Sequence, residues 1–126
     1  MKFCPKLFEF RWDESEKHIQ ALDTTKSHIW ASSTLYSEEW QQKRKHWFAD
    51  WGKANDEVNQ DTVLDFHKNA GEGNPQFDVV MNRENIVRTT SITSIVKKEV
   101  QFEMRYEDIL NGEIEEGTLQ LEKIKA

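Results

Sequence analysis

Hydrophobic and polar residues alternate at the start of the chain with the period of two that is typical of a half-buried β-strand. The alternation is clearest over residues 7–12, where the aromatic side chains fall on one side of the strand. Residues 18–22 and 28–33 give two further strand signals, and polar turns at 13–16 and 23–26 separate the three segments. The pattern predicts an antiparallel meander of three short strands.

A helical period follows in the middle of the chain. Four aromatic residues share one helix face by their spacing of i, i+7, i+8 and i+11: Trp40, Trp47, Phe48 and Trp51. Ser37 is a suitable N-cap for this helix, and Gly52 is expected to end it. We expect the aromatic face to anchor the helix on a sheet. A second, shorter helix is predicted from about residue 61 to 69, closed by Gly71.

The last third of the chain returns to strand-like patterns. Residues 77–81 and 86–95 are predicted to form a hairpin, and residues 100–106 alternate as another strand. The charged tail from Glu113 is expected to pair only loosely. These elements predict one α+β domain over residues 1–126, with antiparallel strands at both ends of the chain and two main helices between them.

Composition narrows the classes of partner. The 126 residues carry a formal net charge of -6, which disfavours a nucleic-acid backbone or an anionic membrane surface as the main partner. Cys4 is the only cysteine, so an internal disulfide is excluded, and no apolar run is long enough to cross a membrane. The first residues lack the pattern of a signal peptide. We therefore predict a cytoplasmic protein whose partner is a small molecule or another protein.

The sequence predicts no metal site and no cofactor. None of the four histidines shares a spacing that would bring two ligands to one helix face or one strand: His18, His28, His46 and His67. Cys4 has no neighbouring pattern that would make it a nucleophile, so it is interpreted as an ordinary thiol. The basic run 43–46 is predicted to be a solvated surface, because acidic residues surround it along the same helix.

Small hydroxyl residues at the expected end of the third strand form the candidate pocket. Ser32, Ser33 and Thr34 precede the aromatic helix, and their hydroxyls could donate to an acyl oxygen or a carboxylate. Asn74, in the glycine- and proline-containing loop 71–75, completes the candidate set. The alternative is that these residues fill a tight corner, which is the commoner role of small polar residues. No general base is paired with them in the sequence, so no catalytic residue is assigned.

The order of segments resembles the C-terminal half of the NRDE family, which includes the transport and Golgi organisation proteins. The resemblance rests on FEFRW (8–12), HIWASSTLYSEEWQQKRKHWF (28–48), VLDFHKNAGEGNPQFDVVMNRENIVRTTSIT (63–93) and FEMRYEDIL (102–110). Trp30 to Leu35, followed by Trp40, corresponds to the family's leucine-serine-asparagine-small-x-leucine segment and its Trp-bearing helix. Members are similar to N-terminal-nucleophile hydrolases, so the resemblance implies part of an αββα sandwich, with two sheets between helix layers.

The chain departs from the family at the positions that would carry catalysis. Family members have a cysteine nucleophile directly after the initiator methionine, and Lys2 holds that position here. Ser32 stands where related hydrolases place an oxyanion-pocket asparagine, and the eponymous Asn-Arg-Asp-Glu segment is absent. The resemblance predicts an NRDE-family chain that is not an enzyme as it stands. Two further hypotheses are a module that binds a small molecule or acyl ligand, and an interaction half that self-associates or pairs with a missing N-terminal half.

Overall fold

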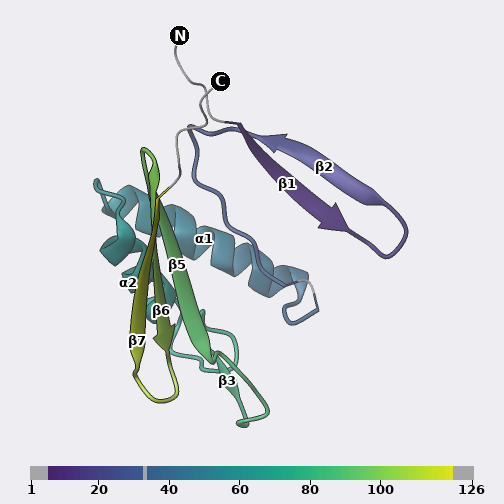
Figure 1. The fold of residues 1–126 in the computed structure, drawn as a ribbon. Coiled ribbons are helices and arrows are strands. Elements are labelled where there is room, and N and C mark those ends of the chain that lie inside the picture. Colours follow the sequence, from purple (N-terminus) through teal and green to yellow (C-terminus); the bar gives the residue numbers. More distant parts are fainter. Residues whose placement is uncertain (1–5, 33, 121–126) are drawn as a thin grey trace. The chain divides into compact units, whose positions relative to one another are not determined.

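The computed structural model describes residues 6–32 and 34–120 of the 126-residue chain. The chain divides into two compact units, the first ending at Trp30 and the second beginning at Ala31. Along the sequence, two strands precede the two helices and five strands follow them among the described residues, and each described strand pairing is antiparallel (Figure 1). The predicted α+β class is confirmed. None of the described helices is both long and apolar enough to cross a membrane.

The first unit is a β-hairpin. β1 (Leu7–Trp12) pairs along its whole length with β2 (Lys17–Leu22), so the first two predicted strands are confirmed. The Asp13 carboxylate closes the turn by accepting hydrogen bonds from two backbone N–H groups of the turn. The His18 ring contacts the same carboxylate, and this contact, together with the N–H donors, lowers the pKa of Asp13.

One face of this hairpin is apolar and exposed. Its large side chains are more than half exposed: Phe8 56%, Phe10 61%, Trp12 57% and Ile19 66%. The sequence predicts a half-buried strand here, whereas the structure has the strand without the burial. Two strands alone cannot bury such side chains against each other, because neighbours on one face of a hairpin lie side by side.

The third predicted strand, at 28–33, is wrong in its described part, which has no strand structure; Ser33 lies outside the described residues. Side-chain contacts hold this segment instead. The His28 ring bonds a backbone carbonyl of the preceding turn, and the Trp30 indole N–H donates to the Glu9 carboxylate. The bond from Trp30 lowers the pKa of the Glu9 carboxyl. Residues 28–30 therefore attach to the hairpin without extending its sheet.

Both helices belong to the second unit. α1 (Glu38–Ala54) begins at the predicted N-cap, where the Ser37 hydroxyl accepts a backbone N–H of the first turn. Gly52 does not end the helix, so that prediction is wrong. The helix ends at Ala54. Its C-cap is Asn55, whose backbone and side-chain N–H groups both donate to the Trp51 carbonyl of the last turn. These two bonds terminate α1 without requiring a glycine.

α2 (Gln60–Asn69) confirms the second predicted helix. Asn59 and Thr62 form a capping box: the Asn59 side chain accepts the N–H of Thr62, and the Thr62 hydroxyl accepts the N–H of Asn59. The helix begins one residue before the predicted start. It ends at Asn69, with Ala70 as its C-cap and Gly71 directly after it.

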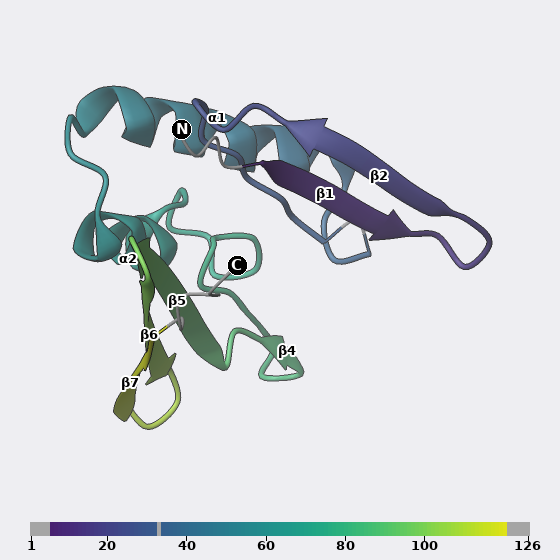
Figure 2. The same ribbon diagram turned by 45° about the horizontal axis from the view of Figure 1, so that its top comes forward.

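Three strands form the main sheet of the second unit, in the order β5 (Ser91–Lys98), β6 (Gln101–Asp108) and β7 (Ile114–Gln120) (Figure 2). β6 confirms the predicted alternating strand. β7 pairs with β6 from end to end, so the expectation of a loosely paired tail is wrong for the residues that the structure describes.

A second, very short hairpin precedes the main sheet. β3 (Asn82–Arg83) pairs with β4 (Val87–Arg88) around Glu84 and Asn85, whose φ angles of 54° and 59° place both in the left-handed region. The predicted hairpin is confirmed at this turn. The single strand predicted over 86–95 is wrong, because the structure divides it between β4 and β5.

Residues 77–81 form no strand, since residue 77 lies in a turn and residues 78–80 are bends, so the strand predicted there is wrong. The carbonyl of Asn74 accepts hydrogen bonds from the N–H groups of Phe77 and Asp78, at 3.0 and 2.9 Å. These bonds curl the loop on itself, which takes its backbone groups away from any strand ladder.

The core of the second unit is small and centred on α2. Five hydrophobic side chains of the described residues are buried: Tyr36, Leu64, Phe66, Met81 and Ile92. On α1, the rings of Phe48 and Trp51 each lie 5.5 Å from the ring of Phe66. Trp40 stacks on Phe77 with 4.2 Å between ring centres. The aromatic face of α1 thus packs on α2 and on the following loop, in place of the expected anchor on a sheet.

Candidate functional site

The predicted pocket residues before α1 form a local turn. The hydroxyl oxygens of Ser32 and Thr34 lie 2.9 Å apart, and the carbonyl of Ser32 accepts a hydrogen bond from the N–H of Tyr36. Ser33 lies outside the described residues. The corner-filling interpretation accounts for these contacts, and a role in a pocket stays a prediction.

Asn74 organises its own loop. Its Oδ1 accepts a hydrogen bond from the N–H of Gln76 at 3.1 Å, which is the usual way in which asparagine closes a turn. These bonds are local, as are those of Ser32 and Thr34. No described hydrogen bond therefore joins Ser32 or Thr34 directly to Asn74.

Arg44 is buried, with 8% of its surface exposed, so the prediction of a solvated basic surface is wrong for this residue. Its Nη2 donates to the carbonyls of Phe77 and Asp78 at 3.0 and 2.7 Å. The guanidinium also lies over the ring of Tyr36, with Cζ 3.7 Å from the ring centre. Burial lowers the pKa of Arg44, and the charge of Arg83 lowers it further. Arg44 ties α1 to the loop that follows α2.

A second guanidinium fastens the same loop to the residues before α1. Arg83 donates from Nε to the carbonyl of Gln76 and from Nη2 to the carbonyl of Leu35, both at 2.7 Å. Its Cζ lies 5.3 Å from the ring centre of Tyr36 and 4.8 Å from that of Phe77. Both arginines donate hydrogen bonds to backbone carbonyls, so this cluster holds residues 76–78 of the loop in place.

Gly71, at the start of the loop that follows α2, has no room for a side chain. Its φ is 149°, and a Cβ at this position would lie within van der Waals overlap of the Asp78 carboxylate, which accepts the N–H of Glu72. Gly71→Ala is expected to lower the free energy of unfolding by about 1–3 kcal/mol, because the backbone and the carboxylate must both move. Urea denaturation measures the change.

The matched substitution Gly52→Ala should have the opposite sign. Gly52 lies inside α1 with nothing near its Cβ position, so alanine is expected to raise the free energy of unfolding by about 0.5–1 kcal/mol. A Gly71→Ala protein as stable as the parent would show that the loop rearranges at no cost.

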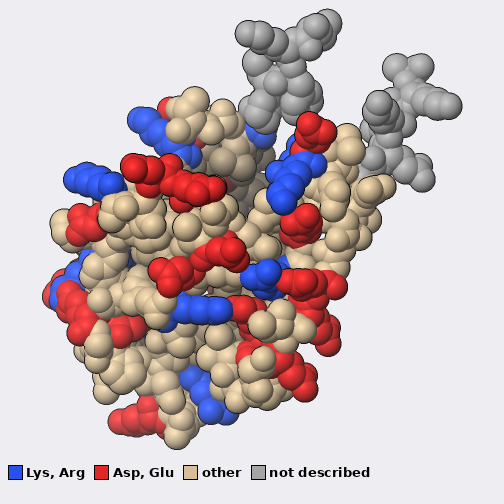
Figure 3. All heavy atoms as spheres, turned by 90° about the vertical axis from the view of Figure 1, so that its left-hand side faces the viewer, with Lys and Arg blue, Asp and Glu red and all other residues tan. Residues whose placement is uncertain are grey.

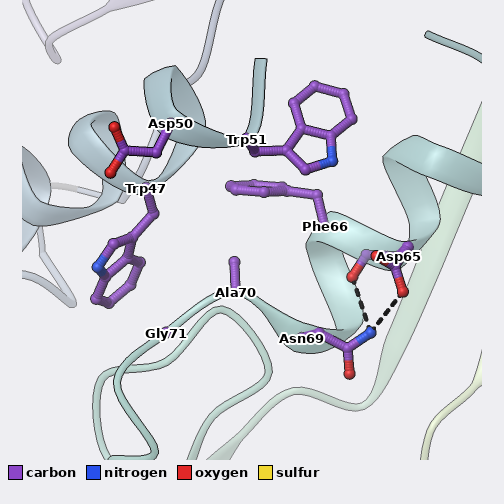
Figure 4. Close-up of a pocket in the computed structure, with 8 residues that line it drawn as sticks. All are labelled: Trp47, Asp50, Trp51, Asp65, Phe66, Asn69, Ala70 and Gly71. Atoms are coloured by element: carbon purple, nitrogen blue, oxygen red, sulfur yellow. Dashed lines mark hydrogen bonds between the residues drawn. The ribbon is translucent and has the colours of Figure 1, made fainter. Parts of the chain in front are cut away.

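A hollow of about 300 Å³ lies between the second half of α1 and α2 (Figure 4). Its lining comes from both helices and the start of the loop: Trp47, Asp50, Trp51, Asp65, Phe66, Asn69, Ala70 and Gly71. Figure 4 shows Trp47 on one side of the hollow, Phe66 and Trp51 on the other, and Ala70 between them. Three aromatic rings therefore supply most of its apolar wall.

Two carboxylates and an amide supply the polar groups of the hollow. The carboxylate of Asp50 lies 3.2 Å from the ring of His46, on the same helix. Asp65 accepts a hydrogen bond from the side-chain amide of Asn69 at 2.7 Å. The indole N–H of Trp51 is buried and has no acceptor among the described residues. The lining contains two acids and neither lysine nor arginine, so its formally charged side chains are all acidic.

The two faces of the main sheet differ in chemistry. α2 lies over one face, which carries the buried Ile92 of β5. The helix also makes three polar contacts with this face: Gln60 with Ser94, Lys68 with Glu107, and Asp61 with Arg105. The strand register places five large apolar residues on the opposite face: Ile95, Phe102, Met104, Tyr106 and Leu119. We call these five residues the open face. Ile95 is 61% exposed and Leu119 64% exposed, so this apolar surface meets solvent.

The charged surface shows no continuous basic patch on the side seen in Figure 3, where acidic and basic side chains are interspersed. Within residues 6–32 and 34–120, no three histidine, cysteine, aspartate or glutamate side chains lie close enough to hold a metal ion. The aromatic hollow and the open face are two surfaces of the second unit whose chemistry points to a partner.

Comparison with known proteins gives no match: no protein-family model fits the chain, and no curated protein or solved structure is significantly similar to it. The resemblance to the NRDE family thus stays a prediction. The function of the chain has to be argued from its geometry.

Proposed function

We propose that this chain is a non-catalytic NRDE-family component that binds another polypeptide, whose strands cover the open face and complete the fold. The observation that carries the proposal is the position of the apolar residues of β6 and β7. They lie on the face of the sheet opposite α2, where Met104, Tyr106 and Leu119 are exposed and Phe102 is half-buried. An exposed apolar surface with many large side chains marks an interaction site in a soluble protein.

Apolar and charged residues alternate along β6, so the two kinds lie on opposite faces of the sheet. Phe102, Met104 and Tyr106 belong to the open face, and Glu103, Arg105 and Glu107 belong to the face under α2. A domain of only two layers would place its apolar strand residues under the helix, because that is the face it can bury. Here the strand presents its charged residues to α2 and its apolar residues to solvent. The pattern favours a sheet that lies between α2 and a further layer.

The layer that suits this surface is a second sheet. Two sheets pack face to face through apolar side chains, about 10 Å apart. In the αββα sandwich that the NRDE resemblance implies, each sheet has helices on one face and the other sheet on its second face. α2 over one face and apolar residues on the other are consistent with half of such a sandwich. β5 and β7 also lie at the two edges of the sheet, where a partner can add strands.

Binding is proposed in preference to catalysis because of the contacts that hydroxyl groups make. In the described ranges, the serine, threonine and tyrosine hydroxyls form hydrogen bonds with carboxylate, carbonyl, hydroxyl, amide, backbone N–H and thioether groups, and none with an imidazole. A serine or threonine nucleophile needs an adjacent base to activate it. The arrangement offers recognition surfaces and no activated nucleophile of this kind.

A lysine on the open face is expected to weaken partner binding at least about tenfold, because it places a charge in an apolar interface. Leu119→Lys makes this change on β7. Thr118→Lys is the matched control, since the neighbouring residue is also exposed but belongs to the opposite face. The probe is the N-terminal half of a full-length NRDE-family domain, co-expressed with the chain, and complex formation is measured by size-exclusion chromatography with light scattering.

Without the partner, the chain is expected to self-associate as its concentration rises and to bind an apolar dye, and Leu119→Lys should reduce both effects. A parent chain that stays monomeric, binds no dye and ignores the added half would remove the open face as an interface. Equal losses in Leu119→Lys and Thr118→Lys would show that added charge, and not the open face, controls association.

A further inference from the structure

We infer that the hollow between α1 and α2 binds an organic ammonium ion, of the kind with methyl or methylene groups around the charged nitrogen. The hollow lies on the helices and shares no residue with the open face. The inference therefore goes beyond the proposed function, and each can fail without the other.

The aromatic walls give the first reason. The faces of tryptophan and phenylalanine rings carry negative partial charge, and they attract a cation placed within about 6 Å of the ring centre. Trp47 stands across the hollow from Phe66, and Trp51 lies 5.5 Å from Phe66 between ring centres (Figure 4). An alkylated ammonium in the hollow can contact the half-buried rings of Trp47 and Trp51, while Phe66, which is 4% exposed, offers little of its ring. The methyl groups of the ammonium suit this apolar surface.

The charges of the lining give the second reason. Asp50 comes from α1 and Asp65 from α2, so a carboxylate borders the hollow on each helix. Each carboxylate has about four acceptor sites, of which the contacts with His46 and Asn69 occupy a part. With no lysine or arginine in the lining, the hollow attracts a cation and repels an anion.

The size of the hollow limits the ligand to a small group. A volume of about 300 Å³ is at the lower end of the range for ligand sites in proteins, which runs from about 300 to 1,000 Å³. A single trimethylammonium or alkylammonium group suits this space. Choline is therefore the probe, and 3,3-dimethylbutan-1-ol is its matched control because it has the same shape without the charge.

The titration is followed by the indole N–H signals in ¹H–¹⁵N spectra of the intact chain. Choline is expected to shift the signals of Trp47 and Trp51 in a saturable manner. Trp30 serves as an internal control, because its indole N–H is bonded to Glu9 in the first unit. The neutral alcohol should bind about tenfold more weakly than choline, since it lacks the attraction to rings and carboxylates.

Three variants distinguish binding at a specific cation site from binding to a general aromatic surface. Asp65→Asn and Trp47→Leu are each expected to weaken choline binding several-fold. Asp61→Asn is the matched control: it removes the same charge from α2, but its carboxylate faces Arg105 and lies outside the lining. It should leave the titration unchanged.

Each of three results would overturn the inference. The first is equal binding of choline and the neutral alcohol, which would leave only an apolar surface. The second is equal weakening by Asp65→Asn and Asp61→Asn, which would mean a general effect of net charge. The third is the absence of any saturable shift of Trp47 and Trp51 in a chain whose spectrum shows it to be folded.

Discussion

Phe66→Ala is expected to lower the free energy of unfolding by about 3–5 kcal/mol, the usual cost of removing a buried aromatic ring. Phe66 is 4% exposed and packs from α2 against the rings of Phe48 and Trp51, which also stack on each other. Its removal leaves both rings of α1 without their contact on α2, and the helices cannot close the space without bending. A loss of this size is a large part of the total stability of a small domain, about 5–15 kcal/mol.

Urea denaturation followed by circular dichroism measures this change. Phe66→Leu keeps most of the apolar volume and supplies a folded reference if the alanine variant does not fold. Phe102→Ala makes the same substitution on the open face, where the ring is only half-buried, and should cost less. Similar losses in Phe66→Ala and Phe102→Ala would mean that α2 is not the centre of the core.

Arg44→Ala is expected to cost about 3 kcal/mol or more. A hydrogen bond to a charged group contributes about 1.5–3 kcal/mol, and Arg44 makes two of them, to the carbonyls of Phe77 and Asp78. The substitution also removes the guanidinium from the ring of Tyr36 and leaves the two carbonyls without their donor. The loop should therefore detach from α1 before the rest of the unit unfolds.

Hydrogen exchange of the loop amides, read together with the denaturation midpoint, tests this expectation. Lys45→Ala is the matched control, because it removes a neighbouring cation that is exposed on the same helix. Arg44→Lys keeps the charge but not the planar group, and should recover only part of the loss. Equal stability of Arg44→Ala and Lys45→Ala would show that the loop is held by other contacts.

The ends of the helices show how far local chemistry determines the fold. Ser37 marks the start of α1 because a hydroxyl residue before an aromatic helical pattern can satisfy a free N–H group, and the structure has this bond. Gly52 was a misleading stop signal, since glycine inside a helix costs only about 1 kcal/mol and can be tolerated. The end at Asn55 depends on two bonds to one carbonyl, which a residue pattern does not reveal.

The failed strand predictions share a cause. A strand needs a neighbour, and composition alone says nothing about which neighbour is available. The segment 77–81 has strand-like residues, but its first two N–H groups, those of Phe77 and Asp78, donate to the carbonyl of Asn74. These bonds turn the chain. β7 shows the reverse case: its charged sequence suggested loose pairing, yet β6 provides a partner along its full length.

The site residues that were not predicted from the sequence are those that contact residues far away along the chain. Arg44 lies within a basic run, and only the loop more than thirty residues later makes it a buried anchor. The hollow likewise combines residues of α1 with residues of α2. A local signal did exist: Trp47, Asp50 and Trp51 are three and four residues apart, so they share one helix face. Asp65 and Phe66 could be added only once the two helices were known to meet.

The order of strands in the main sheet affects how fast the chain can associate with a partner. β5, β6 and β7 are neighbours both in sequence and in space, so their pairing requires only short-range chain closure. Sheets with such local connections form early and quickly compared with those that join distant segments. The open face should therefore exist as a finished surface before an encounter. Association would then be a collision between preformed bodies, with a rate constant on the order of 10⁵–10⁷ M⁻¹s⁻¹, and not a slow folding reaction on a template.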